Sequence, residues 1–182
     1  MITRTLIGGF AMAGVLVFAA EALASARCHM VASITAQQEV PPTAGVNGFG
    51  CGEFLIDTNA NTVTYRIVYS GLTSAETAAH IHGFVAPGVN AGVVHPLPLG
   101  NVKTGVWNYA EAQEASILAG RCYVNIHTAN NPGGEIRGQI TTHVAELDAG
   151  QETPPVGVGS RGWAVLNLDK CQNTLSYYIV VN

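Results

Sequence analysis

The chain has 182 residues, of which 48% are hydrophobic and only 11% are charged, whereas about a quarter of an average soluble domain is charged. This composition, with 21 glycines, excludes a disordered chain and a bundle of charged helices. The formal net charge of −4 provides no basic surface for phosphate groups, so we expect no nucleic-acid partner. The length favours one domain, with somewhat more residues than a single average domain needs.

Residues 1–24 have the pattern of a secretory signal peptide. Arg4 is the only early charge, residues 6–20 are apolar, and Ala22-Leu23-Ala24 provides the small residues that precede a cleavage site. This apolar run is shorter than the roughly 18 to 20 residues that a membrane-spanning helix needs. We therefore expect a periplasmic or secreted protein with no membrane segment after signal cleavage.

Short β-branched and aromatic runs, separated by Gly, Pro and Asn turns, predict an all-β fold. In chain order we expect strands at residues 31–36, 54–56, 62–69, 78–84, 103–108, 122–128, 135–141, 166–169 and 174–181. The one predicted helix covers residues 110–119, and Gly120 ends it. This spacing of short strands favours a β-sandwich or a partly closed Greek key.

The sequence contains an internal repeat. Residues 38–42 (QEVPP) recur as residues 151–155 (QETPP), and residues 50–69 match residues 162–181 at an offset of 112. Hydrophobic, Asp, Asn and Tyr positions all stay in register, so chance does not explain the match.

The second copy has no counterpart of residues 71–141. We therefore expect a complete domain at residues 28–141 and a partial second copy, with its N-terminal strands only, at residues 143–182. Strand edges left unpaired in a partial copy favour association, so a homodimer through this copy is one expectation.

An exported chain with four cysteines can form two disulfides. The candidates are Cys28, Cys51, Cys122 and Cys171, and the sequence does not choose among the three connectivities. No Cys-x-x-Cys motif is present to indicate a zinc or redox site.

Histidines on two predicted strands form the main candidate site. Strand alternation places His80 and His82 on one face, and it places Asn125 and His127 together on another strand. His95, in a Pro-rich loop, is a fourth candidate. Imidazole ligands without thiolates suit copper or zinc. The alternative is a hydrogen-bonded structural cluster without metal.

Polar residues near the predicted turns give a second set of candidates. Glu135 and Arg137 share one strand face after the turn at residues 130–134, where an intrastrand ion pair is the simpler interpretation and a binding role is the alternative. Glu39 precedes two prolines and first indicates a strand end followed by an extended loop. With Asn125, these residues are candidates for a structural or binding face.

The order of these motifs resembles the chordin-type (CHRD) domain. The matching segments are residues 38–42 (QEVPP), 71–72 (GL), 78–83 (AAHIHG), 105–107 (GVW), 120 (G), 123–128 (YVNIHT) and 132–140 (PGGEIRGQI). The resemblance covers residues 30–141, and the second copy resembles only the opening portion of the domain. It implies an exported β-sandwich module, found in animal morphogen antagonists and widely in bacteria, with no established catalytic activity.

A second likeness concerns the histidine strand. Gly71-Leu72 followed by residues 80–84 (HIHGF) is similar to the copper-ligand strand of copper/zinc superoxide dismutases, which are also Greek-key sandwiches. This resemblance implies that His80 and His82 are copper ligands and that His95 and His127 are candidates for the others. The chain lacks that family's His/Asp-rich zinc loop and its arginine-bearing loop. The fold expected is therefore an immunoglobulin-like or superoxide-dismutase-like Greek-key β-sandwich with one short helix.

These observations favour an exported, non-catalytic module that binds a protein, a surface polymer or a metal ion. The alternative is a copper- or zinc-binding periplasmic metalloprotein related in design to copper/zinc superoxide dismutase, for which dismutase-like activity would be the enzymatic outcome. The chain has no Gly-x-Ser-x-Gly, Walker-type or His-Glu-x-x-His motif, so other enzyme classes gain no support.

Overall fold

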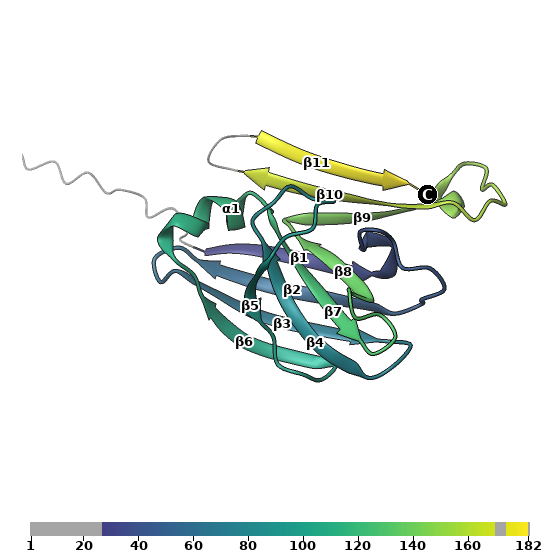
Figure 1. Ribbon diagram of the computed structural model, residues 1–182. Helices are drawn as coiled ribbons and strands as arrows, with labels where there is room; N and C mark the ends of the chain where they lie inside the picture. The colour runs from purple at the N-terminus through teal and green to yellow at the C-terminus, as the bar shows by residue number, and fades with distance from the viewer. Residues whose placement is uncertain (1–26, 170–173, 182) are drawn as a thin grey trace, which may run out of the picture.

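The computed structural model describes residues 27–169 and 174–181 (Figure 1). The predicted signal peptide and Cys171 lie outside these residues. In the described part of the chain, no helix has the length and hydropathy needed to cross a membrane.

Antiparallel strands make up a little over half of the described chain. They are β1 (Arg27–Thr35), β2 (Phe49–Asp57), β3 (Thr62–Ser70), β4 (Glu76–Gly83), β5 (Val93–Pro96), β6 (Val102–Asn108), β7 (Cys122–Thr128), β8 (Ile136–Ile140), β9 (His143–Asp148), β10 (Arg161–Asp169) and β11 (Thr174–Val181). Every predicted strand is present, whereas β5 and β9 were not predicted. The predicted helix is also present but shorter, with a 3-10 turn at Glu111–Gln113 leading into α1 (Glu114–Leu118).

Eight of the strands form one strongly curled sheet in the order β5-β4-β7-β8-β1-β2-β3-β6 (Figure 1). The two edge strands, β5 and β6, lie close together. The ring of His95 on β5 stacks on that of Trp107 on β6, with centroids 5.8 Å apart. The curled sheet therefore encloses its core as a nearly closed sandwich, which confirms the predicted all-β fold with one short helix.

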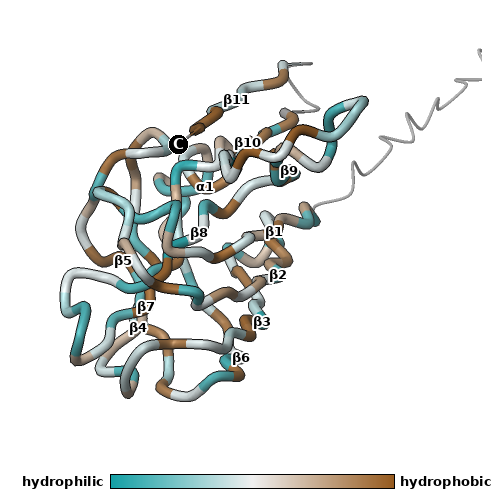
Figure 2. The backbone as a smooth tube through the Cα atoms, turned by 90° about the vertical axis from the view of Figure 1, so that its right-hand side faces the viewer, coloured by the Kyte–Doolittle hydropathy of each residue, from teal (hydrophilic) through white to brown (hydrophobic). Residues whose placement is uncertain are grey.

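Alternation along each strand determines which side chains enter this core. On β4 and β7, Ala79, Ile81, Val124 and Ile126 point inward and are buried, as the period-two pattern predicts. The facing layer contributes buried apolar side chains from β1, β2 and β3. Figure 2 shows hydrophobic residues in brown at intervals along the strands of the sheet. The intervening residues of β4 and β7 are left on the outside of the sandwich.

Strands β9, β10 and β11 form a separate three-stranded sheet beside β1 and β8 (Figure 1). Its pairing repeats that of β1, β2 and β3. Thr35 pairs with Phe49 in the first sheet, and Asp148 pairs with Arg161, which are the positions 113 and 112 residues later. The β10–β11 register likewise matches the β2–β3 register. The internal repeat of the sequence is thus reproduced in backbone pairing.

One of the possible disulfides is not formed in the described residues, because Cys51 and Cys122 are free thiols. Pairings with Cys171 lie outside the described residues and stay a prediction. Cys51 is exposed on β2, whereas Cys122 is buried in the core on β7, where burial raises the pKa of its thiol to about 12. The two sulfurs occupy different environments on different layers, and Cys122 behaves as a small apolar core residue.

Candidate metal site and the polar face around it

The outer side of β4, β7 and β8 carries a row of polar side chains instead of apolar ones. Cross-strand pairing places His80 opposite Asn125 and Asn125 opposite Arg137, so these three share one face. The full set is His80, His82, Tyr123, Asn125, His127, Arg137 and Gln139, which we call the polar face. Three sequence segments, residues 78–83, 123–128 and 132–140, thereby contribute to one surface.

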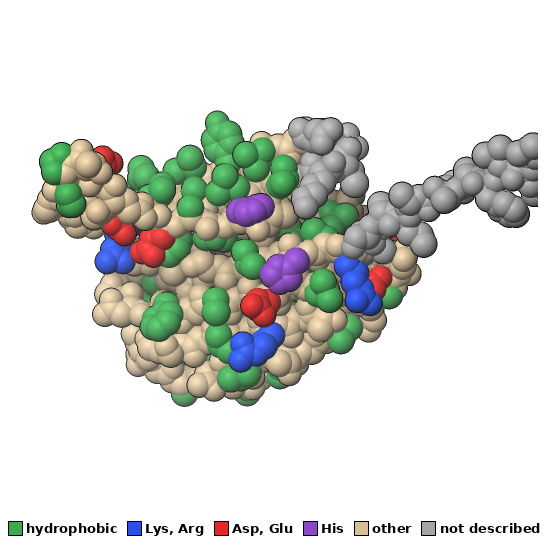
Figure 3. All heavy atoms as spheres, turned by 180° about the vertical axis from the view of Figure 1, so that it is seen from behind, with side chains coloured by type: hydrophobic (Ala, Val, Ile, Leu, Met, Phe, Trp, Pro, Cys, Tyr) green, Lys and Arg blue, Asp and Glu red, His purple; other side chains and the backbone are tan. Residues whose placement is uncertain are grey.

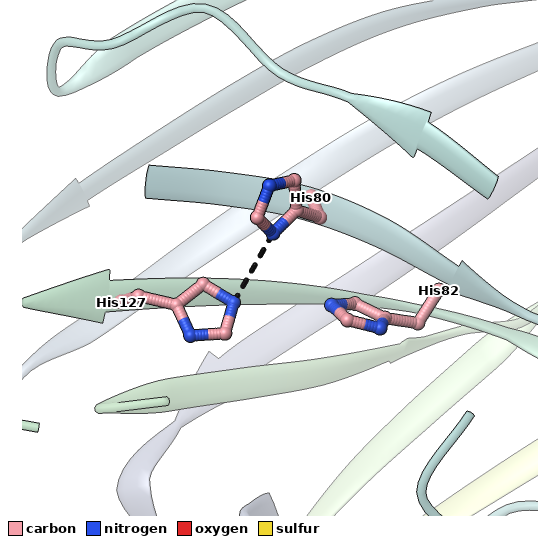
Figure 4. A group of neighbouring side chains, drawn as sticks. All are labelled: His80, His82 and His127. Atoms are coloured by element: carbon pink, nitrogen blue, oxygen red, sulfur yellow. Dashed lines mark hydrogen bonds between the residues drawn. The ribbon is translucent and has the colours of Figure 1, made fainter. Parts of the chain in front are cut away.

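His80, His82 and His127 form a compact cluster on the polar face (Figure 4). One ring nitrogen from each lies within 4.8 Å of the others, and His80 Nδ1 is 3.2 Å from His127 Nε2. His82 is buried, while His80 and His127 are half-buried, so the cluster is reachable from solvent. The predicted grouping of these three histidines is therefore present in the structure.

Backbone carbonyls fix the orientation of two of the rings. His82 Nδ1 lies 2.9 Å from the carbonyl oxygen of Ala91, and His127 Nδ1 lies 3.1 Å from that of Pro132. A carbonyl only accepts hydrogen bonds, so both Nδ1 atoms carry the proton and both Nε2 atoms of the neutral rings have a lone pair. His82 Nε2 is buried and has no hydrogen-bond partner.

Burial also favours the neutral form of these rings. The pKa of His80 is lowered by burial and then by the neighbouring His127. The pKa of His82 is lowered by burial and by the nearby His80, His127 and Arg137, although the hydrogen bond to Ala91 opposes this shift. Neutral imidazole is the form that binds a metal ion.

The cluster has the dimensions of a tri-histidine metal site. Metal–nitrogen bonds of about 2.0–2.1 Å in a tetrahedral site separate the ligand nitrogens by about 3.3 Å. The pair His80–His127 already has this spacing at 3.2 Å, and His82 needs to approach by at most about 1.5 Å. Three imidazoles and no thiolate suit copper or zinc and leave one coordination position open.

His95 does not belong to this cluster. It pairs with Ile81 on β4, so it shares the core side of the sheet with that residue, opposite to His80 and His82. Its ring packs between Trp107 and Tyr65, and its Nε2 is 3.4 Å from the Tyr65 hydroxyl. The prediction of His95 as a fourth ligand is corrected, because the short strand β5 turns this side chain inward.

A buried polar group adjoins the histidines on the polar face. Asn125 Nδ2 donates to Glu39 Oε2 at 3.4 Å, and Asn125 Oδ1 and Glu39 Oε1 are both buried without a partner. Burial raises the pKa of Glu39 to about 7, against the opposing attraction of Arg137. Gly134 has a φ of +132°, and a Cβ there would lie 2.6 Å from the Asn125 amide, so glycine is required beside this group.

Tyr123 connects the histidine cluster with Arg137. Its ring stacks on His82 with centroids 4.9 Å apart, and the guanidinium of Arg137 covers it at 3.5 Å. Arg137 also donates to Asn90 Oδ1 and to the carbonyl of Val89, both at 2.9 Å. Arg137 therefore attaches the loop after β4 to the polar face.

Glu135 and Arg137 do not form the predicted ion pair. The Glu135 carboxylate instead accepts hydrogen bonds from Thr73, Thr128 and Asn131, and it is fully buried. Burial opposes its ionisation, but these hydrogen bonds together hold its pKa below the usual value. Glu135 lies directly before β8, in the β7–β8 turn. Its hydrogen bonds to Thr73 connect this turn to the β3–β4 loop, so its role is structural.

Lys103 was not identified from the sequence. It is fully buried on β6, where its ammonium donates to Glu76 and to the carbonyls of Pro98 and Gly100. The sequence around Lys103 gives no sign that this lysine is buried, because its partner Glu76 is distant in sequence and lies on β4.

Taken together, the fold and the site define an all-β sandwich module with a tri-histidine cluster on one outer face. Within the chain, residues 30–140 match the CHRD domain model, which is more than half of its length. The chain therefore belongs to the CHRD domain family. No curated protein and no solved structure matches it.

Proposed function

We propose that this chain is an exported, non-catalytic CHRD module that binds one copper or zinc ion through His80, His82 and His127. The observation that carries the proposal is the pair of rings whose Nδ1–H groups are held by backbone carbonyls, with their Nε2 atoms directed into the cluster. Outer hydrogen bonds of this kind orient imidazoles in metal sites and set the tautomer that binds.

The buried lone pair on His82 Nε2 favours a metal-binding cluster over a structural cluster held by hydrogen bonds alone. A structural cluster would satisfy each buried polar atom, whereas His82 Nε2 has no donor beside it. Without a bound ion, the Nδ1–H of His80 donates to His127 Nε2, and binding of an ion at His80 Nδ1 would require this proton to move to His80 Nε2. A bound ion would provide Lewis acidity at the open position, and the protein residues orient it and restrict access.

Isothermal titration of the purified, metal-free protein with Zn²⁺ and with Cu²⁺ tests the proposal. We expect one ion per chain, and we expect His82→Ala to lose at least 100-fold in affinity because one of three ligands is removed. Nitrogen couplings in the Cu²⁺ electron paramagnetic resonance spectrum should report bound imidazoles and decrease in the variant.

His143→Ala provides the matched control, because His143 is exposed on β9 and is not part of the cluster. This variant should bind metal as the wild type does. If His82→Ala and His143→Ala bind equally, or if the wild type binds no ion in stoichiometric amount, the metal proposal is refuted and the cluster is structural.

Dismutase-like activity is the second candidate, and the open coordination position favours it. The test is consumption of superoxide by the copper-loaded protein compared with the same concentration of copper-loaded His82→Ala. Equal rates in the two proteins would exclude this activity and leave the non-catalytic proposal in place.

A further inference from the structure

The three-stranded sheet exposes a face that corresponds to a sandwich core. Tyr177 and Ile179 on β11 are 70% and 53% exposed, whereas Tyr65 and Ile67, the residues 112 positions earlier, are 5% and 0% exposed. Leu168, Leu175 and Val181 show the same relation, since they are 37%, 54% and 72% exposed while Ile56, Val63 and Tyr69 are 0%, 2% and 8% exposed. The outward face consists of His143, Ala145, Leu147, Gly162, Ala164, Leu166, Leu168, Leu175, Tyr177, Ile179 and Val181, of which the small residues Gly162 and Ala164 are buried. Figure 3 shows hydrophobic side chains gathered over this sheet.

The opposite face of the sheet is already occupied. Trp163, Val165, Tyr178 and Val180 line a cavity of about 190 Å³ against the polar face and the segment at residues 37–42. In β2 and β3 the corresponding positions include the exposed charged residues Glu53 and Arg66. The second sheet thus packs against the first unit with the side that is solvent-exposed in that unit, and its core side faces outward.

We infer that the outward face of β9, β10 and β11 is a docking surface for the same face of a second copy of this chain. A face built in register with a sandwich core is complementary to another sheet, and stacked sheets pack about 10 Å apart. The outward face contains no Lys, Arg, Asp or Glu, so charge does not oppose its contact with itself. A twofold axis makes such a contact closed and self-complementary.

The size of the face determines the strength expected. Three strands of about eight residues, spaced by about 4.8 Å, cover roughly 400 Å² in projection. Two such faces give about 800 Å² in projection, which is below the roughly 1,200–2,000 Å² of stable specific interfaces and in the range of weak, transient ones. We therefore expect a dimer that dissociates on dilution in the micromolar range, and this inference is independent of metal binding.

Sedimentation equilibrium of the purified protein between 1 µM and about 500 µM tests the inference. We expect the wild type to pass from monomer to dimer in this range. Tyr177→Lys and Ile179→Lys, measured separately, should each raise the dimer dissociation constant at least 100-fold, because the twofold contact places each new charge in the apolar interface twice.

Leu99→Lys is the matched control, since Leu99 is 65% exposed on a loop of the first unit, away from this face. The control should dimerise as the wild type does. All three variants replace exposed side chains, and circular dichroism should show unchanged folding. A wild type that stays monomeric at about 500 µM, or variants of the outward face that dimerise normally, would overturn the inference.

Discussion

The hydroxyl of Tyr123 lies 2.9 Å from the backbone nitrogen of Ala91 and accepts its hydrogen bond. The carbonyl of Ala91 in turn holds His82 Nδ1, and the Tyr123 ring stacks on His82. Tyr123 therefore positions His82 twice, once through its ring and once through the segment that fixes the tautomer. The two contributions separate when only the hydroxyl is removed.

Tyr123→Phe should weaken metal binding more than it destabilises the fold. The ring stack stays, so we expect a stability loss of about 1 kcal/mol for the lost hydrogen bond. Affinity for Zn²⁺ should fall by about 10-fold, because the hydroxyl holds Ala91, whose carbonyl orients the His82 ring. Tyr109→Phe is the control, because its hydroxyl bonds Glu114 far from the site. Unchanged Zn²⁺ affinity in Tyr123→Phe, measured by titration, would contradict this role.

Glu39 should make the protein less stable as the pH rises through the neutral range. Its pKa rises from an ordinary value of 4.5 to about 7 on folding, because burial outweighs the attraction of Arg137 and the hydrogen bonds from Asn125 and Val40. Between these two values the unfolded chain has lost the proton that the folded chain keeps, so folding stability decreases with increasing pH. The full effect is on the order of 3 kcal/mol.

Glu39→Gln should remove this pH dependence, because the amide stays neutral at every pH. Urea unfolding at pH 5 and pH 8 measures the effect, and the variant should lose less stability than the wild type between these values. Glu53→Gln, on the exposed side of β2, serves as the control and should follow the wild type. The lowered pKa values of His80 and His82 act in the opposite direction, so the test is the difference between the two proteins. An equal change in stability between pH 5 and pH 8 in the wild type and in Glu39→Gln would show that Glu39 does not titrate as described.

Glu135→Gln should destabilise the loop connections beside the histidine strands. The carboxylate accepts hydrogen bonds from Thr73 N at 2.5 Å and from Thr128 Oγ1 at 2.5 Å, and an amide replaces one acceptor oxygen with a donor. We expect a loss of about 1.5–3 kcal/mol near neutral pH.

The pH dependence of this loss has a definite sign. The pKa of Glu135 is lowered on folding, so its contribution to stability is present above its ordinary value and disappears as the pH falls through the folded value. Chemical unfolding of wild type and Glu135→Gln should therefore converge in acid. A difference that is the same at pH 3 and pH 7 would show that ionisation of Glu135 is not involved.

Short-range pattern was sufficient for most of the fold and for three members of the candidate site. Strand alternation alone placed His80 and His82 together, and the same rule placed His127 beside Asn125. It failed for His95, because a four-residue strand that ends at Pro96 is too short to show which side chains share a face. It also failed for Glu135 and Arg137, since the turn before β8 directs Glu135 to partners on another loop.

Contacts between side chains that are distant in sequence could not be predicted from the sequence. The partners of Glu39 and Lys103 lie on other strands, and neither residue carries a local sign of burial. The internal repeat was visible in sequence, but which side of the second sheet faces outward depends on packing against the first unit. The outward face became evident only when exposed residues were compared with their buried counterparts.

Lys103 and Glu76 form a buried ion pair. Replacing both members should destabilise the protein less than the sum of the two single effects predicts. Among the described residues, Lys103 is the only cation that contacts the Glu76 carboxylate, and Lys103→Met removes it. This carboxylate also accepts from the Tyr69 hydroxyl and the backbone of Gly100. Breaking a buried pair in this way leaves an uncompensated charge and costs about 3–5 kcal/mol.

The double variant Lys103→Met with Glu76→Gln should recover part of this loss, because the remaining amide is neutral and keeps hydrogen bonds to Tyr69 and Gly100. Urea unfolding of the wild type, both single variants and the double variant closes a double-mutant cycle, in which we expect a coupling energy of about 1–3 kcal/mol. Additive single effects would show that the ammonium is held by the carbonyls of Pro98 and Gly100 and not by Glu76.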